Sequence, residues 1–191
     1  MPRIIAGEAG GIRIQTLEGR NTRPTGDRAK EALFSMLGDI YYGKAVLDLF
    51  AGSGSLGLEA VSRGASSVVF VDQNPRCAEI IRKNAAMCRF NEKVRILRAD
   101  SAKAIRVLSE EKRKFGCIFL DPPYDKDLVS SSIENILTGD IIENEGILVI
   151  EHSSLELPKT EGTGLEMYRN RNYGAINFSI FIYRNTRQGD T

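Results

Sequence analysis

Short apolar runs alternate with amphipathic stretches from residue 45 onward. The runs that have the length and continuous apolar character of buried strands are 45–50, 68–72, 94–97, 117–120 and 146–151. The stretches between them that show helical spacing or helix-start signals are 56–62, 75–88, 101–112 and 128–137. Strands and helices in this alternation form right-handed βαβ units around a parallel sheet. The pattern therefore predicts an α/β fold.

The two ends of the chain depart from this alternation. Residues 165–169 and 175–183 flank a polar segment at 170–174 and predict an antiparallel hairpin at one edge of the sheet. With it the sheet becomes seven-stranded and mostly parallel. Residues 3–17 alternate weakly around three glycines and predict a small hairpin, whereas residues 29–37 have helical apolar spacing. We expect an N-terminal hairpin extension over 1–24, one domain over 25–185 and a tail over 186–191.

Composition narrows the function classes. The chain has 191 residues and a net charge of +1, which suits one domain and does not indicate a general nucleic-acid binder. It has no apolar run of membrane-spanning length and no signal peptide at its start, so we expect a cytoplasmic protein. Cys77, Cys88 and Cys117 lie far apart, which predicts buried reduced thiols and no metal site. The single histidine, His152, is expected to be structural.

A glycine-rich turn at residues 52–57 follows the first strand and leads into a helix. Glycines there would let the backbone approach a ligand at the carboxyl edge of the sheet. The acidic residues at the predicted strand ends are Asp48, Asp72, Asp100 and Asp121. Such a crevice would repel a pyrophosphate and suit a cation, which favours S-adenosylmethionine (AdoMet) over a dinucleotide. The plainer alternatives are a carboxylate that binds turn amides for Asp48, and helix N-caps for Asp72 and Asp100.

The segment Asp121-Pro122-Pro123-Tyr124 ends the fourth predicted strand. Its prolines stiffen the backbone, its ionised carboxylate only accepts hydrogen bonds, and its tyrosine offers a flat face. Two fixed acceptors beside an aromatic ring suit a planar base with an exocyclic NH2 group. The alternative is a rigid turn with no role in binding.

Several motifs in order resemble AdoMet-dependent methyltransferases that modify exocyclic amines: Asp48-Leu49-Phe50-Ala51-Gly52-Ser53-Gly54, Asp72 and Asp121-Pro122-Pro123-Tyr124. Two upstream segments, Arg3-Ile4-Ile5-Ala6-Gly7 and the stretch from Thr22 to Phe34, resemble the bacterial small-subunit ribosomal RNA guanine-N2 methyltransferases of the D type. The resemblance covers nearly the whole chain. It implies a Rossmann-like class I methyltransferase fold, AdoMet as the methyl donor and N2 of a ribosomal guanine as the acceptor.

The resemblance also implies roles for individual residues. The candidate cofactor residues are Asp48, Phe50, Ala51, Gly52, Ser53, Gly54, Asp72, Gln73, Asp100, Ser101 and Asp121. The candidate catalytic residues are Asp121, Pro122 and Tyr124. The candidate RNA contacts are Arg3, Arg20, Arg23, Arg28, Lys30 and Arg171, which come from two arginine-rich segments near the chain ends. The bland interpretation of both segments is a solvated face.

The expected partner is ribosomal RNA within an assembling or protein-bound small subunit, and we expect the protein to act as a monomer. Three other functions remain open at this point. The chain could methylate adenine N6 or cytosine N4 in other RNA or DNA, it could bind AdoMet or RNA without catalysis as an assembly factor, or it could methylate a small amine.

Overall fold

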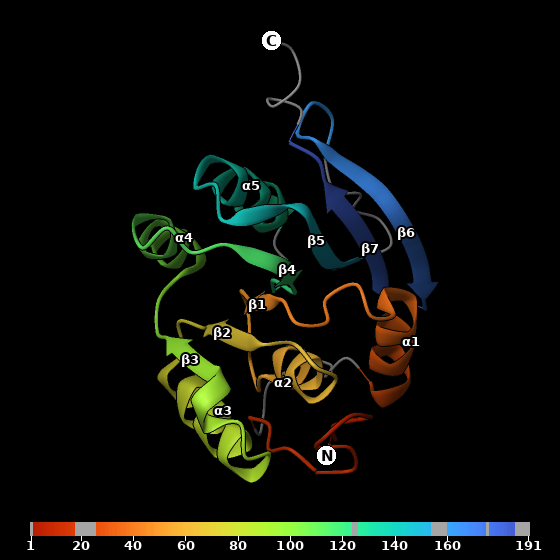
Figure 1. The fold of residues 1–191 in the computed structure, drawn as a ribbon, viewed down its shortest axis with the longest axis vertical. Coiled ribbons are helices and arrows are strands. Elements are labelled where there is room, and N and C mark those ends of the chain that lie inside the picture. The colour runs from red at the N-terminus through yellow and green to blue at the C-terminus, as the bar shows by residue number, and fades with distance from the viewer. Residues whose placement is uncertain (1, 18–25, 124–125, 154–159, 175, 186–191) are drawn as a thin grey trace.

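The protein folds as a seven-stranded sheet with helices on both faces (Figure 1). This computed structural model describes residues 2–17, 26–123, 126–153, 160–174 and 176–185. The strands are β1 (Ala45–Asp48), β2 (Ser67–Val71), β3 (Val94–Leu97), β4 (Phe115–Leu120), β5 (Ile142–Ser153), β6 (Leu165–Tyr173) and β7 (Ile176–Tyr183). The helices are α1 (Asp27–Leu37), α2 (Ser55–Ser62), α3 (Pro75–Met87), α4 (Ser101–Glu110) and α5 (Lys126–Thr138), with a short 3-10 turn at Asn91–Lys93.

The strand order is β3-β2-β1-β4-β5-β7-β6. The first five strands of this order, β3, β2, β1, β4 and β5, run parallel, and β7 pairs antiparallel with both β5 and β6. The order reverses between β1 and β4, and in open α/β sheets ligands bind at such a switch point, outside the carboxyl ends of the strands. The predicted α/β class and the seven-stranded sheet with its antiparallel hairpin are confirmed.

Two apolar layers hold the sheet. Helices α1, α2 and α3 cover one face, where Phe34 and Ile81 pack with Phe119 and Phe178, and helices α4 and α5 cover the other (Figure 1). Neighbouring residues of one strand divide between the layers, as Val46 and Leu47 do. Burial on both faces explains why the central strands are continuous apolar runs. All three cysteines are buried and form no disulfide, as predicted.

The N-terminal segment forms less β-structure than expected. Arg3 and Arg13 make a single antiparallel bridge, and Ile4 and Ile14 are fully buried in the layer under α1 and α2. Gly7 has φ +81°, and a Cβ at this position would lie 1.9 Å from the Ser62 carbonyl oxygen. The closely spaced glycines disfavour a longer strand pairing. Contact with α2 therefore holds the segment in place.

The C-terminal hairpin is longer than predicted. Strand β6 continues to Tyr173, so the expected turn at 170–174 is wrong for most of its length. Residues 166–174 are exposed, and this polar stretch has turn-like composition because β6 is an edge strand. Pairing with β7 therefore holds this segment as a strand, although its own sequence does not indicate one.

Within the described residues, none of the helices is long and apolar enough to cross a membrane.

Candidate active site at the carboxyl edge of the sheet

Three acidic residues meet where β1 and β4 end, beside the last residues of β5. Asp48 pairs with Phe119 of β4, and Leu120 pairs with Ile150 of β5. Asp121 and Glu151 are the next residues along these two strands, so they follow a directly paired row. Burial raises the pKa of Asp121, and the nearby Glu151 and Asp48 carboxylates raise it further. Acidic side chains therefore gather at the point where the sheet topology predicts a ligand.

Asp48 has both a structural and an electrostatic role. Its Oδ2 accepts a hydrogen bond of 3.0 Å from the Gly57 amide in the first turn of α2. Burial raises the pKa of Asp48 to about 7, although the Gly57 hydrogen bond opposes the shift. The alternative that Asp48 binds an amide of the glycine-rich turn is thus observed, and it is compatible with a role in attracting a cation.

The glycine turn is tied to the end of β2. The Gly52 amide donates to Asp72 Oδ2 over 3.0 Å, and the Ala51 amide donates to the Val71 carbonyl. Gly52 and Gly54 have φ values of +54° and +79°, which favour glycine. A Cβ at Gly52 would meet no atom within 4 Å, so this part of the turn borders open space. The backbone can therefore lie close to a ligand there.

Gly57 permits α2 to pack against β2. A Cβ at this position would lie 2.3 Å from the Phe70 ring. We expect Gly57→Ala to cost about 1–3 kcal/mol of unfolding free energy through overpacking and to weaken AdoMet binding by displacing the turn. Urea unfolding and calorimetric titration measure the two effects. Gly26→Ala is the matched control, because a Cβ there meets nothing within 4 Å, and an equal loss in both variants would contradict the packing explanation.

The remaining acidic residues of the predicted site accept hydrogen bonds from nearby backbone amides. Asp72 Oδ1 accepts from the Asn74 amide, and Asn74, not Asp72, caps α3. Asp100 caps α4, because its Oδ1 accepts from the Lys103 amide over 2.8 Å. Gln73 and Asp100 are exposed, whereas Ser101 is half-buried at the start of α4. Each carboxylate keeps lone pairs for a ligand, so these cofactor roles stay predictions.

The candidate catalytic motif begins beside the turn. Phe50 and Ser53 are half-buried and Ala51 is buried at the same edge, and Pro122 is half-buried next to Asp121. Among the described residues, no donor makes a hydrogen bond to the Asp121 carboxylate. Tyr124 lies outside the described residues. The two parts of the predicted site, the 52–57 turn and the start of the 121–124 motif, are therefore adjacent.

Lys30 requires a correction. We expected it to contact RNA, but its side chain is fully buried. Its Nζ donates to the Arg3 carbonyl over 2.6 Å and to Ser55 Oγ over 3.0 Å, and it lies 3.2 Å from Glu59 Oε2. Burial lowers the pKa of Lys30 while Glu59 raises it. The ammonium group thus joins the N-terminal segment and α1 to the start of α2, and the prediction of an RNA contact is wrong.

Glu59 is the centre of this buried network. Its carboxylate accepts from the Ile5 and Ala6 amides and pairs with Arg63 over 2.7 Å as well as with Lys30. A second link lies nearby. Asn84 of α3 exchanges two hydrogen bonds with the Gln15 backbone and donates to the Ser53 carbonyl over 2.9 Å. The N-terminal segment therefore supports the glycine turn from both sides.

The other predicted RNA contacts differ in their surroundings. Arg3 pairs with Asp27 over 3.4 Å, whereas Arg28 and Arg171 are exposed and have no ion pair within the described part of the chain. Arg20 and Arg23 lie outside the described residues. His152 Nε2 lies 2.8 Å from Ser179 Oγ in the buried sheet, in agreement with a structural role.

Sequence reasoning missed Glu151 at this edge, and it missed Glu59 and Asn84, which join the N-terminal segment to α2 and α3. Glu151 could have been found, because it ends a predicted strand on the same edge as Asp121. Glu59 and Asn84 lie within helices, and only the packed N-terminal segment explains their burial. No cluster of three or more potential metal ligands occurs within the ranges that the structure describes.

Comparisons with known proteins agree with this geometry. The Bacillus subtilis protein YlbH, provisionally named an rRNA methyltransferase, is 35% identical over 183 residues, which cover 95% of this chain and 99% of that protein. The ribosomal RNA small subunit methyltransferase D of Haemophilus influenzae is 31% identical over 177 residues, covering 87% and 91%. The solved structure of Escherichia coli yhhF, provisionally named a methyltransferase, has a TM-score of 0.81 at 23% identity and covers 96% and 98%.

The likeness to yhhF shows a shared fold, and the class I methyltransferase architecture that the motifs implied is confirmed. The family model described as "Conserved hypothetical protein 95" matches residues 2–182. Because that match spans nearly the whole sequence, and the relatives it agrees with include a small-subunit methyltransferase D, the chain belongs to the Conserved hypothetical protein 95 family.

Proposed function

We propose that the protein transfers a methyl group from AdoMet to the exocyclic N2 of a guanine in small-subunit ribosomal RNA. The observation that carries this proposal is the half-buried Asp121 carboxyl group, which lies beside Asp48 and Glu151 at the end of β4 and next to the glycine turn. The names of the relatives support ribosomal RNA as the substrate class. The choice of guanine N2 rests on the family resemblance and on the acceptor-only character of the motif.

The site fits AdoMet by its charge and its backbone. Burial, together with neighbouring carboxylates, holds the pKa values of Asp48 and Asp121 above their usual range, and a bound cation would stabilise the ionised form of each group. The turn at Gly52 offers open space for close approach, and Asp72 holds that turn while it keeps lone pairs for ribose hydroxyls. A pyrophosphate would be repelled by Asp48, Asp72 and Asp121 at this edge. AdoMet, when bound, supplies a methyl group already activated by a positive sulfur.

The chain's own residues then orient the acceptor. The Asp121 carboxylate and the Pro122 carbonyl accept hydrogen bonds from the base NH2 and so aim the nitrogen lone pair into the crevice. These bonds strengthen as positive charge grows on the nitrogen, which stabilises the transition state. The raised pKa of Asp121 suits it to receive the proton that the methylated amine loses. Alignment of the two reactants can supply about 7–11 kcal/mol of the barrier reduction in favourable cases.

Base access sets a condition on the substrate. A paired guanine cannot bring its N2 to a ledge at the end of a strand, so the target must be unpaired or flipped out. Tyr124, the next residue but one after Pro122, would stack on the base and contribute about 1–3 kcal/mol of binding. The expected methyl acceptor is therefore an accessible guanine in assembling or protein-bound small-subunit RNA.

The direct test uses AdoMet with a labelled methyl group and purified small-subunit particles that lack their natural methylation. After digestion to nucleosides, we expect label in N2-methylguanosine. Label confined to N6-methyladenosine or N4-methylcytidine would instead support the amine methyltransferase alternative. Binding of AdoMet without any label transfer to RNA or particles would favour a non-catalytic assembly factor.

Cofactor binding should release protons near neutral pH. The pKa of Asp48 is about 7, so this carboxyl group is about half protonated at pH 7, and a bound cation lowers its pKa. We expect a fraction of a proton to leave on AdoMet binding. The affinity for AdoMet should rise between about pH 6 and pH 8, a range that extends roughly one pH unit to either side of the Asp48 pKa. Calorimetric titration in two buffers of different ionisation enthalpy measures the release.

Asp48→Asn is the matched variant, and it should release less. S-adenosylhomocysteine, whose sulfur is uncharged, should also release fewer protons from the wild-type protein. Proton uptake by the wild-type protein, or equal release by the two ligands, would contradict the electrostatic account.

A further inference from the structure

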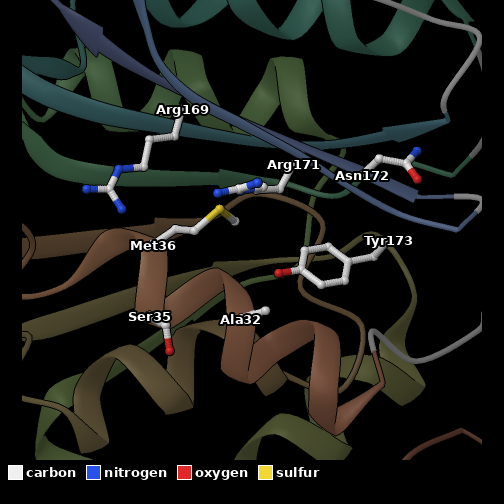
Figure 2. A pocket seen from close by; sticks show the side chains of 7 residues that line it. All are labelled: Ala32, Ser35, Met36, Arg169, Arg171, Asn172 and Tyr173. Carbon is white, nitrogen blue, oxygen red and sulfur yellow. The ribbon is translucent and has the colours of Figure 1, made fainter.

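A groove of about 520 Å³ lies between α1 and the edge strand β6 (Figure 2). The wall on α1 is small and mostly uncharged, being formed by Ala32, Ser35 and Met36. The opposite wall belongs to β6, whose residues from 166 onward are exposed. The groove is open to solvent along its length, so an extended chain can enter it without rearrangement of either element.

Register explains why the basic side chains of β6 point into this groove. Arg169, Arg171 and Tyr173 pair with residues of β7 that belong to the apolar layer beneath α1. Directly paired residues of an antiparallel sheet share a face. The three side chains therefore extend on the side of the sheet where α1 lies, and Figure 2 shows them facing Met36 and Ala32.

The groove has an unbalanced positive charge. Among the described residues, no carboxylate lies within ion-pair distance of Arg169 or Arg171. Arg184 of the same hairpin differs, because it pairs with Glu145 and Glu166 at 3.3 Å each. The Arg169 guanidinium lies over the Tyr168 ring, 5.0 Å from its centre, which leaves its outer edge available to an anion. Two unpaired guanidinium groups beside an exposed tyrosine suit phosphates and a base.

The groove is connected to the active site by the sheet. Glu151 pairs with Phe178, and Phe178 pairs with Arg171, so Arg171 lies on the same cross-strand row as Glu151. Asp121 follows Leu120, whose partner Ile150 precedes Glu151. Three strand spacings thus separate Asp121 from Arg171, or about 14 Å. A polynucleotide whose target base lies at Asp121 can reach this groove with neighbouring nucleotides.

We propose that the α1–β6 groove binds an unpaired RNA segment next to the target guanine. Arg169 and Arg171 bind phosphates of that segment, and the Tyr173 ring stacks on one of its bases. The proposal rests on the RNA substrate proposed above and adds where the flanking strand lies. Arg169, Tyr173 and the α1 wall would thus bind the substrate at a place outside the 121–124 motif.

Binding of a short, fluorescently labelled single-stranded RNA, followed by anisotropy at several salt concentrations, tests the groove. We expect Arg169→Gln/Arg171→Gln to bind on the order of tenfold more weakly or worse, because two phosphate contacts are lost. The slope of log K against log salt should become shallower by about 1.4, or two contacts at about 0.7 each for a single strand. Tyr173→Leu should weaken binding and leave that slope unchanged.

Arg106→Gln/Arg113→Gln is the matched control, because it removes the same charge from exposed positions at α4 and just beyond it, on the opposite face of the sheet. Ser35→Glu probes the α1 wall without a change in β6, and it too should weaken binding. AdoMet affinity should stay unchanged in every variant. If groove and control variants bind RNA equally, the groove proposal is overturned while the methyl-transfer function stands.

Two further outcomes separate the proposals. If the wild-type protein methylates small-subunit RNA and the groove variants lose affinity only for protein-bearing particles, the groove binds a protein and the RNA assignment is overturned. If the wild-type protein binds AdoMet but no RNA or particle at all, the proposed function itself is contradicted.

Discussion

Asp121→Asn should lower the methyl-transfer rate by about 10²–10³-fold, the usual loss when one group that stabilises transition-state charge is removed. The amide has nearly the same shape as the carboxylate but one acceptor fewer and no charge. It can therefore neither match the positive charge that grows on the base nitrogen nor take its proton. Single-turnover rates with labelled AdoMet and small-subunit particles measure this loss, and titration with AdoMet should show that the variant still binds the cofactor.

The same substitution should not damage the fold. The pKa of Asp121 is raised in the folded protein, so the ionised group opposes folding at every pH above its unfolded value and stops opposing it only when both states are protonated. Thermal unfolding of Asp121→Asn at pH 8 should therefore occur at the same or a higher temperature than in the wild type. The difference should vanish below about pH 4, where carboxyl groups are protonated in both states.

Asp39→Asn, an exposed carboxylate just after α1, is the matched control and should alter neither the rate nor the unfolding temperature. A variant at position 121 that turns over near the wild-type rate would remove the proposed catalytic role. Lower stability at pH 8 with normal activity would indicate that Asp121 is structural.

Glu59→Ala should be the most destabilising single substitution in the N-terminal layer. It leaves the buried Lys30 ammonium without its counter-ion and the Ile5 and Ala6 amides without their acceptor. Removal of one partner from a buried ion pair costs about 3–5 kcal/mol. For a chain of this size such a loss lowers the unfolding temperature by roughly 10 °C. Urea denaturation of the wild type and the variant measures the free energy directly.

Lys30→Met provides the informative comparison. Glu59 would keep Arg63 and two backbone amides, so we expect a smaller loss of unfolding free energy than in Glu59→Ala. Lys30→Met should nevertheless weaken AdoMet binding, because it removes the hydrogen bond to Ser55 at the start of α2. An equal loss of stability in the two variants would contradict the central position of Glu59 in the network.

The parallel sheet could be predicted from the sequence because its strands are buried on both faces and appear as uninterrupted apolar runs. The acidic strand ends could be predicted for a related reason, since the carboxyl ends of parallel strands gather at one edge. Tertiary contacts decided the rest. Lys30 is buried because the N-terminal segment folds over α1 and α2, which no local pattern reveals. Strand β6 is exposed from residue 166 onward because it is an edge strand, and no alternating apolar pattern marks it, so its pairing depends on β7.

The central claim is that the acidic crevice and the Asp121 ledge together methylate N2 of a ribosomal guanine. Its most direct test is mass analysis of nucleosides from small-subunit RNA of cells that lack this protein. We predict the loss of N2-methylguanosine at one site, restored by the wild-type gene and not by the Asp121→Asn gene. An unchanged nucleoside profile, or restoration by both genes, would contradict the account.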